Sequence, residues 1–117
     1  MKFYGKTDVG VCRTENQDCF GIYEILPGVT LLAVCDGMGG AAGGKIASEI
    51  AENTFMSSTV SFCETLNKDN FDSKKLKVAI EESVQKANAA ILEKAREDLS
   101  LFGMGCTLNA LVFCDFK

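Results

Sequence analysis

Residues 29–44 constrain the fold of this chain more than any other stretch. They begin with a nearly all-apolar run, residues 29–35, and continue with Asp36, after which five glycines fall within eight residues. An apolar run of this length predicts a strand buried on both faces. The carboxylate of Asp36 then stands at the end of that strand, before a glycine-rich passage into a helix.

The flanking sequence predicts a small set of further elements. Residues 2–9 form a weak candidate strand, and residues 20–25 pair with 29–35 in an antiparallel hairpin around a Pro27-Gly28 turn. A helix is expected over about residues 43–62. A second begins after Asp72 or Ser73 as its N-cap and ends near Ser100. Its apolar stripe comprises Leu76, Ile80, Val84, Ala87, Ile91 and Ala95. A last strand is expected at residues 107–113.

This order of elements predicts an α+β fold, an antiparallel sheet with two long helices on one face. The other face of such a sheet still has to be buried, and few strands remain to cover it. We therefore interpret residues 1–117 as part of a single domain, or as a domain that completes its core with a partner. A homo-oligomer formed through the uncovered sheet face is expected.

The amino-acid composition limits the catalytic chemistry and the partners that this chain can use. The 117 residues include no histidine, so the commonest general base and transition-metal ligand is missing. Twelve basic against 16 acidic side chains argue against nucleic acid or an anionic membrane as partner. The six cysteines form no Cys-x-x-Cys pair, and the chain begins with no apolar signal segment. We expect reduced, mostly buried cysteines in a cytoplasmic protein that uses carboxylates, backbone groups and hard cations.

Asp36-Gly37 is the first candidate site. A rigidly held carboxylate beside a glycine carbonyl free to turn toward the same ion suits Mg²⁺ or Mn²⁺. An isolated Asp-Gly is more often a simple turn. The glycines fit a dinucleotide-binding pattern only if Ala42 replaces its last glycine, and a phosphate-binding loop fails because Ile46 follows Gly44-Lys45.

Two further segments carry polar groups. Residues 13–18 combine Arg13, which can grip a phosphate through two N–H groups, with the carboxylate of Asp18. Residues 103–108 form a tight glycine turn that places the Thr107 hydroxyl near a strand start. Either segment alone would be read as an ordinary turn.

Together the three segments are far more specific. Arg13-x-x-Asn16-Gln17-Asp18, residues 34–40 (Val-Cys-Asp-Gly-Met-Gly-Gly) and residues 104–108 (Met-Gly-Cys-Thr-Leu) resemble the metal-dependent serine/threonine protein phosphatases of type 2C, in their compact bacterial branch. The resemblance implies an α-β-β-α sandwich, of which this chain would be the N-terminal half. It also implies hydrolysis of phosphoserine and phosphothreonine in proteins, with a cluster of Mn²⁺ or Mg²⁺ ions.

The resemblance also implies roles for individual residues. Asp36 would bridge two metal ions, the Gly37 carbonyl would add a ligand, and Asp18 would act on metal-bound water. Arg13 would bind the substrate phosphate, and Gln17, which stands where many relatives carry Glu, would contribute to the metal site through water. Supporting positions are Asn16, Gly39, Gly40 and Thr107.

Departures from the family pattern shape the functional expectation. The family's remaining aspartate ligands fall beyond residue 117, Asp115 matches none of them, and Cys106 replaces the usual Thr. We therefore expect negligible phosphatase activity from this chain. The alternative is a non-catalytic, shortened phosphatase-like module acting in self-association or phosphoprotein binding. A sporulation or stress-response relative is a weaker alternative, because that branch generally lacks the segment carrying Arg13 and Asn16.

Overall fold

The computed structural model describes residues 18–115. Its elements in chain order are β1 (Asp18–Leu26), β2 (Val29–Met38), α1 (Gly40–Cys63), α2 (Ser73–Glu97), the short 3₁₀ helix η1 (Leu99–Leu101) and β3 (Gly105–Cys114). The predicted strand at residues 2–9 lies outside the described residues. The α+β class and the expected element order are otherwise confirmed.

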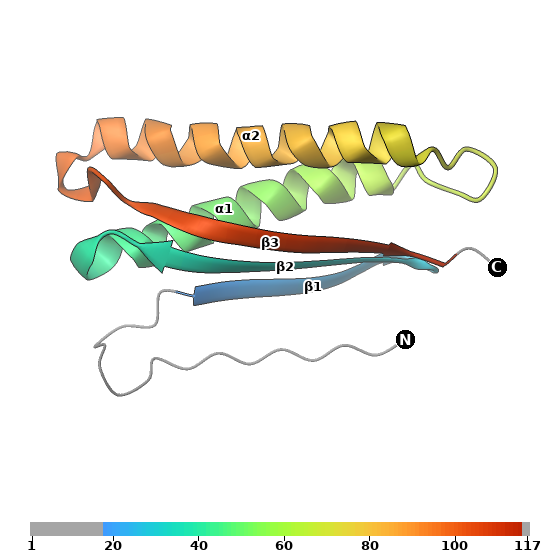
Figure 1. Cartoon of the computed structure of the whole chain (residues 1–117), viewed down its shortest axis with the longest axis horizontal. Coiled ribbons are helices and arrows are strands. Elements are labelled where there is room, and N and C mark those ends of the chain that lie inside the picture. Colours follow the sequence, from blue (N-terminus) through green and yellow to red (C-terminus); the bar gives the residue numbers. More distant parts are fainter. Residues whose placement is uncertain (1–17, 116–117) are drawn as a thin grey trace.

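The three strands form one antiparallel sheet with β2 in the centre (Figure 1). The predicted hairpin around Pro27-Gly28 is confirmed, and Gly28 takes a φ of 86° that favours glycine in the turn. The β1–β2 register shifts once, between Glu24 and Leu26. All three strands are slightly longer than the apolar pattern indicates.

Burial alternates along β2. Val29, Leu31, Ala33 and Cys35 are buried, whereas Val34 is 51% exposed. The expectation that this strand is buried on both faces is therefore wrong. Both helices cover the same face of the sheet, as predicted, and the residues between 18 and 115 place no layer on the other (Figure 1). We call that second face the open face.

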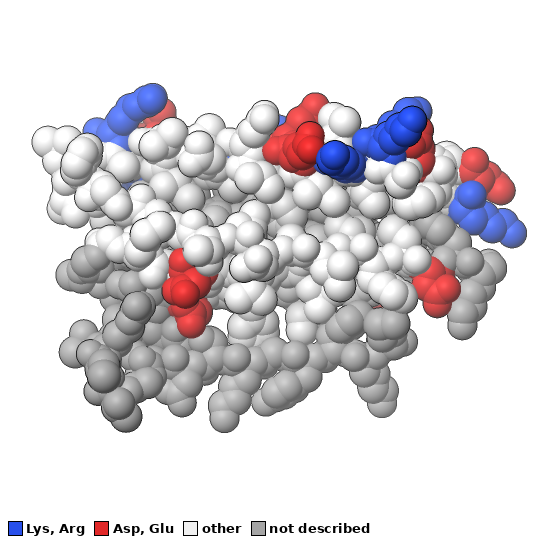
Figure 2. Space-filling view, viewed as in Figure 1, with Lys and Arg blue, Asp and Glu red and all other residues white. Residues whose placement is uncertain are grey.

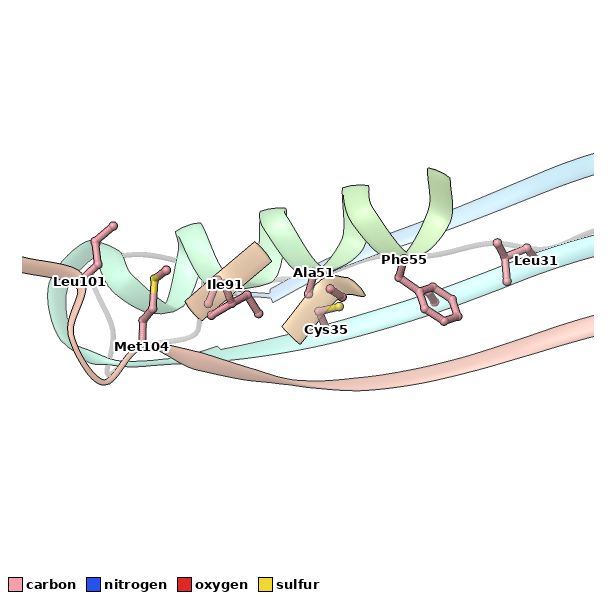
Figure 3. Packing of buried hydrophobic residues seen from close by; sticks show 10 residues of the cluster. Leu31, Cys35, Ala51, Phe55, Ile91, Leu101 and Met104 are labelled. Atoms are coloured by element: carbon pink, nitrogen blue, oxygen red, sulfur yellow. The ribbon is translucent and has the colours of Figure 1, made fainter. Parts of the chain in front are cut away.

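The core lies between the sheet and α1. Ala47, Ala51 and Phe55 of α1 pack against Leu31 and Cys35 of β2, where the small alanines let the helix approach the sheet closely (Figure 3). The second helix adds Ala87 and Ile91, and Leu101 and Met104 close the end of the cluster where β3 begins. This packing buries the side chains of β2 that face the helices.

The helix ends depart from the sequence expectation in two places: α1 begins at Gly40, three residues before the expected start, and α2 ends at Glu97, before Ser100. Asp72, one of the two expected N-caps of α2, is confirmed, because it accepts a hydrogen bond from the Lys74 backbone N–H at 2.9 Å.

The apolar stripe of α2 also differs from the prediction. Val84 is 42% exposed, and Ser83 is buried in its place. Burial of Ser83 is tolerated because its Oγ lies 2.8 Å from both Ser58 Oγ and the Ala79 carbonyl. Neither helix of residues 18–115 combines the length and apolar character that a membrane crossing requires.

Candidate functional site

Three polar side chains form a row across one end of the sheet. Asp36 on the central strand is the register partner of Asp18 on β1 and of Thr107 on β3. Asp36 and Thr107 are exposed and Asp18 is half-buried, on the open face. Three of the predicted site residues are thus brought together where β1 and β3 begin. Figure 2 shows acidic side chains near that end and an uncharged surface toward the middle.

Two carboxylates on directly paired positions repel each other, since their Cβ atoms lie about 4.5–5.5 Å apart in such pairs. A cation between them would offset this repulsion, and oxygen donors suit Mg²⁺ or Mn²⁺. Within residues 18–115, however, no three His, Cys, Asp or Glu side chains are placed to hold a metal ion. The carboxylate and hydroxyl oxygens of this row are the type of ligand that a hard cation prefers. They are too few to surround one.

The backbone near Asp36 differs from the prediction in two ways. Asp36 lies within β2, which continues to Met38, and Gly37 stays in the strand opposite Cys106 with no positive φ. The unusual conformation falls instead at Gly39, with φ 125° and ψ 45°. A Cβ at Gly39 would lie 2.6 Å from Met104 Cα. Gly39 is therefore required for the close approach of the β2–α1 connection to the segment preceding β3.

This contact joins two of the sequence segments, residues 34–40 and 104–108, into one structural unit. The family model described as protein phosphatase 2C matches residues 13–117, which include all three segments. The chain belongs to the protein phosphatase 2C family.

Individual phosphatases agree with this assignment. The serine/threonine protein phosphatase PstP of Mycobacterium tuberculosis is 29% identical over 113 residues, which are 97% of this chain and 19% of PstP. The solved structure of the S. agalactiae serine/threonine phosphatase gives a TM-score of 0.74 at 30% identity, covering 94% of this chain and 43% of that one. The catalytic domain of PstP in complex with two manganese ions gives 0.67 at 30% identity, covering 94% and 42%. The chain thus spans less than half the length of these relatives.

Of the remaining predicted site residues of this phosphatase 2C chain, some lie within the described residues and some do not. Arg13, Asn16 and Gln17 lie outside the described residues, so their positions relative to Asp36 stay predictions. Gly40 is the first residue of α1, at the same end of the sheet as Asp36. A metal-ligand role for the Gly37 carbonyl also stays a prediction.

A buried carboxyl lies behind the row, on the helix side of the sheet. Glu52 of α1 is 7% exposed, its Oε2 accepts a hydrogen bond from the Cys35 thiol at 3.3 Å, and its Oε1 has no partner among the described residues. Burial raises the pKa of Glu52. Its carboxyl occupies the space beneath Gly21, where a Cβ would lie 2.5 Å from Oε1.

Sequence reasoning missed Glu52, because a single Glu in a helix is normally solvated. The available signal was its place immediately after Ala51 in the apolar stripe that continues to Phe55. At that position the glutamate falls on the edge of the buried face.

The cysteines agree with chemistry that uses no thiol nucleophile. All five described cysteines are free; Cys35 and Cys63 are buried and the others partly so. Burial raises the pKa of the Cys35 thiol, and its hydrogen bond to Glu52 raises it further. Burial also raises the pKa of the Cys63 thiol to about 11. A thiol with a raised pKa is poorly ionised near neutral pH and a weak nucleophile.

An open groove of about 500 Å³ lies at the opposite end of the sheet. Glu24, Pro27, Asn67, Lys68 and Asp115 are among its lining residues. These residues belong to the β1–β2 turn, the connection between the helices and the end of β3, far along the strands from Asp36. The groove is therefore separate from the row of carboxylates.

Proposed function

We propose that residues 1–117 form the N-terminal part of one phosphatase 2C domain, and that the whole domain hydrolyses phosphoserine and phosphothreonine in proteins. The coverage supports this, because 94% of the chain matches 42–43% of solved phosphatase chains. The open face supports it as well, since the second half of a sandwich would cover it. No observation favours the non-catalytic alternative.

The observation that carries the proposal is the pairing of Asp18 with Asp36 at the end of the open face. We assign Asp36 as the bridging metal ligand, with the Gly37 carbonyl beside it and Asp18 positioned to orient water. Mn²⁺ is supported by the PstP catalytic domain, which was solved with two manganese ions. Mg²⁺ would be held by the same oxygen donors.

The chemistry follows from these donors. A bound divalent cation lowers the pKa of water and offsets charge on the phosphoryl oxygens, so histidine is not required. Arg13 would bind the phosphate through paired N–H groups, Asn16 would support that segment, and Gln17 would contribute to the metal site through water. Gly39 holds the connection between β2 and α1, and Thr107 offers a hydroxyl beside Asp36.

The chain of 117 residues is proposed to be nearly inactive by itself. Two carboxylates leave most of the positions around a divalent cation to water, so the cation is held weakly. We also propose that the chain self-associates through the open face, which would remove its apolar side chains from water. The cytoplasmic location stays a prediction from the sequence.

The test combines metal binding with turnover. Calorimetric titration with Mn²⁺ should give weak binding to the chain and none to Asp36→Asn, while Glu24→Gln, at the far end of the same face, should match the wild type. Hydrolysis of p-nitrophenyl phosphate with Mn²⁺ should be negligible beside the S. agalactiae phosphatase. Equal Mn²⁺ binding by Asp36→Asn would contradict the assigned site, and turnover like that of the relative would contradict the inactivity.

A further inference from the structure

We propose that Glu52 is a positioning residue for Asp18: while its carboxyl is protonated, it packs β1 against α1 and keeps Asp18 in register with Asp36. Ionisation of Glu52 then favours a local opening at the start of β1, which separates the two aspartates. The functional consequence rests on the role proposed for Asp18 in orienting water. The packing of β1 does not, because it concerns the helix side of the sheet and is independent of whatever covers the open face.

The Glu52 carboxyl touches both strands that carry the aspartates. Its Oε2 accepts a hydrogen bond from the Cys35 thiol on β2 at 3.3 Å, and its Oε1 lies under Gly21 on β1. Cys35 immediately precedes Asp36, and Figure 3 shows it in the layer between β2 and α1. Gly21 is three residues from Asp18. The carboxyl therefore spans the β1–β2 junction beside the paired aspartates.

The first strand, β1, has few other contacts that fix its position. No residue of β1 is fully buried, and within residues 18–115 it pairs with β2 alone. Gly21 presents no side chain to α1, so the helix side chains approach its backbone. A Cβ at Gly21 would lie 2.5 Å from Glu52 Oε1 and 3.2 Å from Met56 Cε, one helical turn later. A strand with few buried contacts opens locally at a low cost in free energy.

The surroundings of Glu52 favour its neutral form. The side chain is 7% exposed, its Oε1 has no hydrogen-bond partner, and no Lys or Arg among residues 18–115 forms an ion pair with it. Earlier on α1, Lys45 and Glu49 pair with each other at 3.7 Å. Burying a carboxylate without a cation costs far more than burying the neutral acid, and burial accordingly raises the pKa of Glu52.

The groups that the other elements place near Glu52 carry no positive charge. The sheet contributes one thiol from each strand, those of Cys19, Cys35 and Cys106. From α2, Ala87 and Ile91 enter the core cluster that also contains Cys35. Asp18 and Asp36 lie on the opposite face of the sheet. None of these groups offsets a charge on Glu52, so an ionised Glu52 must regain contact with water.

The direction of the pH dependence follows from linkage. The packed state binds the Glu52 proton more tightly than the open state, in which the carboxyl is solvated and has its ordinary pKa of 4.5. The packed state is therefore favoured below pH 4.5 and loses stability as the pH rises toward the raised pKa of the packed state. Because β1 is an outer strand, it is the element that can move away from α1. Asp18 moves with it.

Hydrogen exchange measured by NMR on the ¹⁵N-labelled chain tests this opening. Protection factors correct for the intrinsic pH dependence of exchange, and low urea concentrations distinguish a local opening from global unfolding. We expect the amides of residues 18–21 to exchange through an opening that urea barely promotes. Their protection should fall by up to tenfold per pH unit above pH 4.5 and then become constant.

Two neutral variants and one matched control assign the effect to Glu52. In Glu52→Gln the protection of residues 18–21 should be independent of pH, and Glu52→Met, a second neutral side chain of similar length, should give the same result. Glu49→Gln removes an exposed glutamate from the preceding turn of the same helix and should keep the wild-type pH dependence. Circular dichroism checks that each variant retains the fold.

Three results would overturn the proposal. These are exchange of residues 18–21 only through global unfolding, wild-type protection that does not change with pH, and equal pH dependence in the wild type and both Glu52 variants. Mn²⁺ titration of Asp36→Asn tests the proposed metal site separately. If Mn²⁺ binding is independent of Asp36, the proposed site fails while the packing role of Glu52 stands; if only the exchange result fails, the site stands without this control.

Discussion

The contact between Gly39 and Met104 predicts a large and specific loss of stability in Gly39→Ala. The added Cβ would lie 2.6 Å from Met104 Cα and 3.1 Å from Met104 Cβ, at a φ of 125° that L residues rarely adopt. A sparsely populated backbone conformation costs about 1–3 kcal/mol. Overpacking of a tight contact adds about 1–3 kcal/mol, because Met104 must move by roughly 1 Å to restore a normal carbon–carbon distance.

Two other glycines serve as matched controls. Gly103 also has a positive φ, 84°, but nothing lies within 4 Å of its virtual Cβ, so Gly103→Ala isolates the conformational cost of about 1–2 kcal/mol. Gly105 has no positive φ, and its virtual Cβ lies 3.4 Å from Met38 Cε, an ordinary contact, so Gly105→Ala should be nearly neutral.

Urea unfolding followed by circular dichroism measures all three variants. We expect Gly39→Ala to lose more unfolding free energy than Gly103→Ala by about 1–3 kcal/mol, or to fail to fold where Gly103→Ala folds. Equal losses in the two variants would refute the reasoning. They would mean that the β2–α1 connection does not press against Met104.

Three further comparisons test the packing and its charges. Because the pKa of Glu52 is raised in the folded state, the free energy of unfolding of the wild type should fall as the pH rises above 4.5, the value in the unfolded chain. In urea unfolding, the Glu52→Gln variant should therefore be as stable as the wild type at pH 4 and more stable at pH 8. Phe55→Ala, at a fully buried position, should lose about 3–5 kcal/mol, and Phe102→Ala, 83% exposed, less than about 0.5 kcal/mol; similar losses would contradict the assigned core. Asp72→Ala removes the N-cap of α2 and should lower the free energy of unfolding by about 1 kcal/mol, whereas Asp69→Ala, at an exposed position, should leave it unchanged. Equal melting of the two variants would contradict this expectation.

Local signals in the sequence predicted much of the fold. The Pro27-Gly28 turn between two apolar runs indicated the hairpin, and the four-residue spacing of apolar side chains indicated α2. These patterns succeed because turn chemistry and helix periodicity act over a few residues. The resulting class, a sheet with two helices on one face, is confirmed.

Other features depend on tertiary packing and could not be read locally. An all-apolar run such as residues 29–35 looks the same whether one or both faces are covered, which is why the exposure of Val34 was missed. The glycine-rich residues before Gly43 have low helix propensity, yet α1 begins at Gly40, and a Cβ at Gly43 would approach Met104 Cβ to 3.2 Å. Tertiary contact therefore set the start of this helix.

In the candidate site too, some features were predictable from the sequence and others depend on tertiary packing. The sequence singled out Asp18 and Asp36, but their direct pairing depends on the register of β1 with β2, including its shift near Glu24. Glu52 was missed because its burial results from the space that Gly21 leaves on a neighbouring strand. Neither relation is visible in spacing along the chain.

The location of bound Mn²⁺ tests the central claim most directly. Paramagnetic Mn²⁺ broadens the amide NMR signals of nearby residues, so titration of ¹⁵N-labelled chain with small amounts of the ion maps its position. The account predicts that broadening begins at Asp18, Asp36, Gly37 and Thr107, and is lost in Asp36→Asn. Broadening that begins instead along the exposed acidic side chains of α2, or around Glu24 and Asp115, would contradict it.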